Sequence, residues 1–235
     1  MSYPIYLFFG VLPSAIWLLF YLRKDSHPES NRMILKIFFY GMLIAIPTVL
    51  IEIGILGDVE KLILSPFSMS ILKIFVGVAL IEEFLKYLVV REKVIIHHEF
   101  DEPLDTMLYM IIAALGFAAS ENILILFSQG PNSLFQDTLS ISLFRFVGAT
   151  FLHALCSGAF GYFLAWSYYE PKNKMKFAIV GIGLATLLHG LYNFSIMKMN
   201  DSLKFFVPLV ILIGLAIFVS LGFKKLKKIK SVCKI

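Results

Sequence analysis

Charged side chains stand inside a stretch of this sequence that is otherwise apolar. The segment VALIEEFLKY holds Glu82, Glu83 and Lys86, with the lysine within one helical turn of both acids. The surrounding run 71–90 is long enough to cross a bilayer as a helix. Charges in such a run are costly and usually face the interior of a helix bundle, where they mark a functional site. The segment therefore predicts a buried reaction centre.

Three further apolar runs carry polar side chains of the kinds that activate water. They are Glu121, Asn122, His153, Ser157, His189 and Asn193. The last four form two pairs spaced four residues apart, so each pair shares one face of its helix. Counting ~1.5 Å per residue from the ends of the runs, the acids and histidines lie roughly 10–18 Å deep. Groups at a common depth predict one shared site.

The residue types define the chemistry of this site. A carboxylate and an imidazole together deprotonate a water molecule, or bind a metal ion that lowers the pKa of that water. An amide such as Asn193 can stabilise an oxyanion. His153 lies alongside Ser157 rather than facing its hydroxyl, which disfavours a serine nucleophile. The pattern favours a water-activating hydrolase over a proton-coupled transporter, and either over a membrane scaffold.

Each side chain also has an ordinary structural explanation. Intramembrane histidine and asparagine often bond a neighbouring helix, and Glu82 with Lys86 can form a structural ion pair. Ser157 and Cys156 suit small packing positions. Three carboxylates, two histidines and two amides at one depth are harder to explain by packing, so the joint pattern favours function.

The composition fits a multi-pass membrane protein. Of the 235 residues, 59% are hydrophobic and only 16% are charged. The net charge of +5 is spread over short loops and the last residues rather than gathered in one patch, which argues against a nucleic-acid partner. Two cysteines predict neither a disulfide framework nor a cysteine metal site.

Hydrophobic runs predict an all-α fold, a polytopic membrane bundle of about seven transmembrane helices. The runs are 5–22, 34–55, 71–90, 106–127, 144–166, 177–197 and 205–223. The mixed stretch 131–142 predicts an interfacial helix. No basic residue precedes the first run, so it is interpreted as a membrane helix and not a signal peptide. We expect one domain over 1–235 with a short basic tail at 224–235.

Loop charges predict the orientation in the cell membrane, because lysine and arginine stay on the cytoplasmic side. Loops after the first, third, fifth and seventh runs are basic, whereas the alternate loops carry far fewer basic residues. This places the N-terminus outside and the C-terminus in the cytoplasm. The final lysines are interpreted as an anchor at anionic lipid.

Four motifs occur in a familiar order: EEFLK (82–86), GFAASEN (116–122), HALCSG (153–158) and HGLYN (189–193). Together with YLRKDSHPE (21–29) and EFDEPLDTMLY (99–109), they resemble the PrsW family of bacterial intramembrane proteases over nearly the whole chain. Two positions depart from that pattern, Thr106 in place of glycine and Asn193 in place of the aspartate of some members.

The resemblance implies a glutamate and histidine type of intramembrane protease. Its functional set carries over to this sequence as Glu82, Glu83, Glu121, His153, His189 and Asn193. The implied partner is a membrane-anchored anti-sigma factor, cleaved near the extracytoplasmic side as the first step of regulated intramembrane proteolysis. Related APH-type proteins keep part of the architecture as a scaffold.

Two mechanisms follow from these residues. In the preferred one no cofactor is needed: Glu82 activates water with His153, Glu83 lies near Lys86 and Asn122, and His189 and Asn193 bind the oxyanion. The alternative is a Zn²⁺ site of Glu121, His153 and His189 with one position for water.

Overall fold

We analysed a computed structural model that describes residues 3–25, 27–95, 102–130 and 133–229. Helices account for nearly all of these residues, and no strand occurs among them. The all-α membrane fold expected from the sequence is therefore confirmed. Residues 230–235 of the predicted basic tail, and parts of the stretches 21–29, 99–109 and 131–142, lie outside the described residues.

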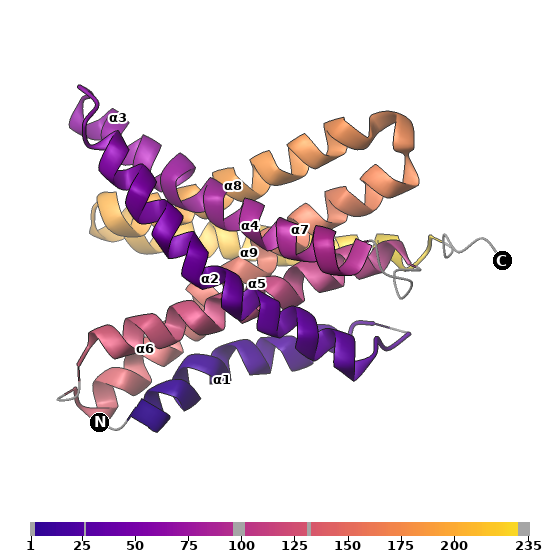
Figure 1. Cartoon of the computed structure of the whole chain (residues 1–235), viewed down its shortest axis with the longest axis horizontal. Helices are drawn as coiled ribbons and strands as arrows, with labels where there is room; N and C mark the ends of the chain where they lie inside the picture. Colours follow the sequence, from indigo (N-terminus) through magenta and orange to yellow (C-terminus); the bar gives the residue numbers. More distant parts are fainter. Residues whose placement is uncertain (1–2, 26, 96–101, 131–132, 230–235) are drawn as a thin grey trace.

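The helices follow one another with short connections (Figure 1). Their bounds are α1 Tyr3–Leu22, α2 Asn31–Val59, α3 Pro66–Ile71, η1 Leu72–Leu80, α4 Ile81–Val90, η2 Arg91–Ile95, α5 Pro103–Ser128, α6 Phe135–Val147, α7 Ala149–Tyr169, η3 Pro171–Asn173, α8 Lys174–Lys198 and α9 Asp201–Leu226. The elements α3, η1, α4 and η2 form one uninterrupted helical run over 66–95, in which η1 and η2 have the wider π-helical turn.

Six helical stretches within the described residues are long and apolar enough to cross a membrane. The run 66–95 is a seventh long helix, and it carries the charged residues Glu82, Glu83 and Lys86. The first turn of α1 and the last turn of α9 lie at opposite ends of the bundle (Figure 1). The chain is thus a multi-pass membrane protein.

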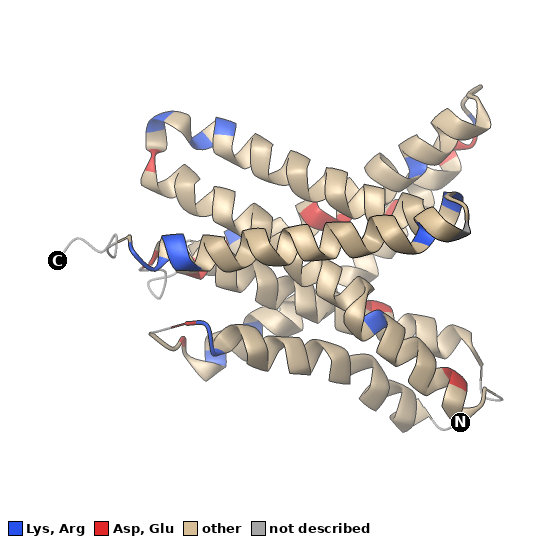
Figure 2. Ribbon diagram, turned by 180° about the vertical axis from the view of Figure 1, so that it is seen from behind, with Lys and Arg blue, Asp and Glu red and all other residues tan. Residues whose placement is uncertain are grey.

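Basic residues gather at one end of the bundle. Figure 2 shows most lysines and arginines around the end of α9 and the loops that join α1 to α2 and α7 to α8. The opposite end has fewer (Figure 2). Lys61 follows the end of α2, and Lys198 is the last residue of α8. This asymmetry agrees with the alternation of loop charges along the sequence.

The central helix is α5, which packs against α1, α2 and α7. Most of its residues are buried, including the whole stretch from Pro103 to Ala119. Close approach of α2 depends on Gly116, because a Cβ atom there would lie 2.0 Å from the carbonyl oxygen of Phe38. Small residues at such crossings let membrane helices pack backbone to backbone. This packing places the last turns of α5, with Glu121 and Asn122, beside α7.

The structure divides the fifth predicted span. The run 144–166 straddles a break at Gly148, whose backbone angles (φ −95°, ψ −98°) are not helical. Helix α6 ends before this glycine and α7 begins after it. Most of α6 corresponds to the stretch 131–142 that we expected as an interfacial helix, and it packs against α1, α5 and α7. The break brings Arg145 of α6 next to the end of α5.

Candidate active site

Glu83 is the most enclosed of the acids, and its side chain has no exposed surface. It accepts hydrogen bonds from Lys86 Nζ (2.8 Å), Ser157 Oγ (2.7 Å) and His189 Nδ1 (3.0 Å). These donors come from α4, α7 and α8, so one carboxylate ties together three helices. Because Lys86 follows Glu83 by three residues on the same helix, the ion pair forms within one turn.

Glu121 occupies the opposite side of the site and is less enclosed, with about a third of its side chain exposed (32%). Its Oε2 atom lies 2.8 Å from His153 Nε2 and 2.8 Å from Arg145 Nη2. Arg145 also donates through Nε to the side-chain oxygen of Asn122. The arginine thereby holds two successive residues of α5 in place from α6.

The two carboxylates fix the hydrogen positions of both histidines. An ionised carboxylate only accepts hydrogen bonds, so His153 donates through Nε2 to Glu121 and His189 donates through Nδ1 to Glu83. In the neutral rings this leaves lone pairs on His153 Nδ1 and His189 Nε2. These two atoms lie 3.7 and 3.9 Å from Glu82 Oε2. Glu82 and the two bare nitrogens thus converge.

Lys86 neutralises this cluster from within the protein. Its ammonium lies 3.2 Å from Glu82 Oε2 and 2.9 Å from His153 Nδ1, besides the bond to Glu83. It also stands over the ring of Phe117, 4.5 Å from the centroid, so the remaining side of the charge contacts an aromatic face. A fully buried lysine with this set of neighbours keeps two adjacent glutamates close together.

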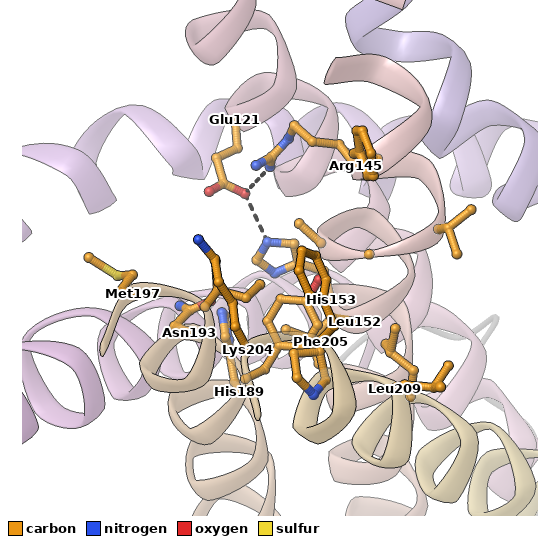
Figure 3. A pocket seen from close by; sticks show the side chains of 18 residues that line it. Glu121, Arg145, Leu152, His153, His189, Asn193, Met197, Lys204, Phe205 and Leu209 are labelled. Atoms are coloured by element: carbon orange, nitrogen blue, oxygen red, sulfur yellow. Dashed lines mark hydrogen bonds and ion pairs between the residues drawn. The ribbon is translucent and has the colours of Figure 1, made fainter. Parts of the chain in front are cut away.

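A pocket of about 510 Å³ reaches the histidines from the surface of the bundle (Figure 3). It lies between the α6–α7 junction, α8 and α9, and polar groups meet at one end of it. The polar side chains that line it are Glu121, Arg145, His153, His189, Tyr192, Asn193 and Lys204. Most of the other lining residues are apolar, and several, such as Phe144 and Phe205, are exposed on the membrane-facing surface. The pocket therefore connects the two histidines with the apolar outer surface of the bundle.

Comparisons with known proteins identify the family. Residues 29–221 match the family model described as the PrsW family intramembrane metalloprotease. Protease PrsW of Geobacillus kaustophilus is 30% identical over 190 residues, covering 80% of this chain and 78% of that protein. Protease PrsW of Bacillus subtilis is 27% identical over 226 residues, covering 95% and 94%. This chain belongs to the PrsW family. No solved structure matches the chain significantly.

The PrsW family is described as metal-dependent, and the donors in this chain fit a metal ion. Glu82, His153 and His189 each offer one ligand atom, and the three atoms lie within 4.8 Å of one another. Imidazole nitrogens and a carboxylate are the ligands of catalytic zinc sites. The other ring nitrogen of each histidine donates a hydrogen bond to a carboxylate, Nε2 of His153 to Glu121 and Nδ1 of His189 to Glu83. Metal-binding histidines are commonly oriented by such a hydrogen bond. The Lys86 ammonium is within hydrogen-bond distance of two of the candidate ligand atoms, Glu82 Oε2 and His153 Nδ1. It would have to move away from both atoms for a metal ion to bind there.

The structure gives Glu121 and Asn122 other partners than the sequence-based assignments did. The carboxylate that joins both histidines is Glu82, whereas the alternative zinc site named Glu121, which contacts only His153 of the two. Asn122 is not next to Glu83: its amide donates to the Gly10 carbonyl (3.1 Å) and to Thr150 Oγ1 (3.1 Å). His189 donates through Nδ1 to Glu83 and lines the pocket together with Asn193, and the expected oxyanion role of this pair stays a prediction.

Ser157 has a polar role that its small size concealed. We expected it as a supporting residue of the site, with a packing position as its ordinary structural explanation, and its hydroxyl donates to Glu83. Two charged residues were overlooked in the sequence. Arg145 is a lone arginine at the start of an apolar run, and Glu52 is a lone acid in the second run. One carboxylate oxygen of Glu52 is buried without a hydrogen bond to any described residue, and the signal for both was an isolated charge in a membrane span.

Proposed function

We propose that this PrsW-family chain hydrolyses a peptide bond of another membrane protein, with Glu82, His153 and His189 as the reaction centre. The observation that carries the proposal is the convergence of one carboxylate and two unprotonated imidazole nitrogens beside a pocket that opens on the apolar outer surface of the bundle. The same three residues would hold the metal ion. A divalent metal at this position polarises the scissile carbonyl and lowers the pKa of water.

In the mechanism without a metal ion, Glu82 takes up the proton that the attacking water releases and returns it to the amine as the carbon–nitrogen bond breaks. His153 and His189 are held in fixed tautomers by Glu121 and Glu83, so their unprotonated nitrogens keep facing Glu82. Asn193 lines the pocket one turn from His189, and its amide is placed to donate to the oxyanion. Lys86 balances the charge of the two adjacent glutamates throughout.

We infer the side of cleavage from the position of the pocket and the substrate class from the resemblance to the PrsW family. The pocket lies toward the end of the bundle where α8 meets α9, which is the end with fewer basic residues (Figure 2). By the positive-inside rule this end is extracytoplasmic. We infer cleavage near the outer surface, with a single-pass anti-sigma factor as the substrate. Reporter fusions after Lys24 and Ser133 test the orientation, and an extracytoplasmic signal from the Lys24 fusion would reverse it.

The decisive experiment compares the unchanged protein with Glu82→Gln in proteoliposomes that contain membrane proteins of the host. New N-termini are mapped by mass spectrometry, and bound metal is measured on the same samples. We expect Glu82→Gln to lower cleavage about 10³-fold or more. The control is Glu92→Gln, which changes an exposed acid farther along the same helical run. Full cleavage by Glu82→Gln would refute the proposed centre.

A chelator separates the two mechanisms on the unchanged protein. If a metal takes part, removal of the metal abolishes cleavage and Glu82→Gln or His153→Ala lowers the metal content from about one per chain. If the glutamate acts without metal, chelation leaves the rate unchanged while Glu82→Gln still abolishes it.

A further inference from the structure

The pocket contains two cations that differ in their partners. Arg145 is bonded to Glu121 and Asn122 and has only 15% of its side chain exposed. Lys204 lines the same pocket from the first turn of α9, and its side chain extends into it toward Glu121 (Figure 3). The Lys204 ammonium has no hydrogen bond or ion pair with any residue that the structure describes, whereas the ammonium groups of Lys73 and Lys86 are both paired with acids.

The position of Lys204 is unfavourable for the chain alone. A positive charge in the first turn of a helix opposes the helix dipole. Most of the pocket around it is apolar. In such surroundings an opposite charge stabilises an ammonium far more than the same pair would be stabilised in water. Among the charged groups facing it, Glu121 is already bonded to Arg145 and His153. The ammonium is thus available to a group that enters the pocket.

We propose that Lys204 selects the substrate, by binding the carboxylate of a substrate residue two or three positions from the bond that is cleaved. This inference rests on the proposed function, because it assigns the occupant of the pocket as the membrane protein being cut. A ligand that lies between Lys204 and the histidines contacts the reaction centre at one end and the ammonium at the other.

The spacing along α8 and α9 gives the position of the selected acid. His189 lies nine residues before the end of α8, and Lys204 lies three residues after the start of α9. With a rise of ~1.5 Å per residue, their depths differ by roughly 9 Å. An extended chain covers about 3.4 Å per residue. The acidic residue is therefore expected about two or three residues from the cleaved bond, on the side of the α8–α9 connection.

The test uses the full chain in proteoliposomes with a library of synthetic single-span peptides whose residues near the outer end of the membrane segment are randomised. Cleaved sequences are read by mass spectrometry. The unchanged protein should favour aspartate or glutamate about tenfold at one position near the cut. Lys204→Gln should remove this preference, and Lys204→Glu should replace it by one for lysine or arginine. The matched control is Lys198→Gln, which removes an exposed charge at the same end of the bundle but outside the pocket.

Each result decides the proposal. An identical sequence preference in all four proteins overturns it, as does an equal loss of cleavage for acidic and neutral peptides in Lys204→Gln, which would show that the lysine acts on Glu121. Cleavage of no peptide by the unchanged protein, together with no new N-termini in host membrane proteins, would refute the proposed function itself. Cleavage without acid preference refutes only the role of Lys204.

Discussion

The two histidines are held by glutamates that lie in very different surroundings. Glu83 is fully enclosed and accepts three hydrogen bonds from three helices, whereas Glu121 keeps about a third of its side chain exposed (32%) at the pocket. Both perform the same task, since each fixes the tautomer of one imidazole. The enclosed pair, His189 with Glu83, joins three helices around Lys86. The more exposed pair, His153 with Glu121, lines the pocket, so we expect it to affect activity more than stability.

The largest expected effect on stability separates these two glutamates. Glu83→Gln removes the closest ion-pair partner of a fully buried lysine, and breaking a buried pair costs roughly 3–5 kcal/mol. Glu121→Gln alters a partly exposed pair, for which we expect a loss of about 1 kcal/mol or less. Unfolding of the two purified variants in detergent, followed by circular dichroism, measures the difference. Equal losses would show that the two regions are not distinct in stability.

The sequence allowed the helices and most of the site to be predicted because charged residues in apolar runs have few alternatives to facing one another. Glu82, Glu83, His153 and His189 do converge, as their common depth indicated. The partners of each residue were not predictable. Which helix faces of α5 and α2 meet depends on close contacts such as Gly116 with Phe38, and no sequence period encodes those contacts.

The break at Gly148 shows a second limit of the sequence. An apolar run through this glycine reads as one continuous span, so Arg145 falls at its edge and looks like an interfacial residue. The non-helical backbone at Gly148 instead turns α6 against α1 and α5, and the arginine enters the site. The backbone geometry at Gly148 therefore decides whether Arg145 lies at the membrane interface or beside Glu121 in the site.

A smaller effect is expected from a substitution of Arg145, which tests the role of the more exposed glutamate, Glu121. Arg145→Gln removes the cation that fixes Glu121 and Asn122, so the hydrogen bond from His153 to Glu121 becomes less well oriented. Loss of such an outer partner typically lowers activity about 10–100-fold. We expect this fall in kcat with little change in unfolding temperature, and no effect from the exposed control Arg91→Gln. A large fall in unfolding temperature with an unchanged kcat would show that Arg145 supports the packing of the helices and not the reaction.

The smallest expected effect concerns the hydrogen bond from Ser157 to the enclosed carboxylate of Glu83. Ser157→Ala removes one of three donors to Glu83 and leaves one carboxylate oxygen buried without that bond, which costs about 1–3 kcal/mol. Ser167→Ala is the matched control on the same helix, because its equally buried hydroxyl bonds only the Leu164 carbonyl three residues earlier. We expect lower thermal stability for the first variant, near-unchanged stability for the second, and cleavage by both. Complete loss of cleavage by a stably folded Ser157→Ala protein would instead make this serine the nucleophile and contradict the assignment of Glu82.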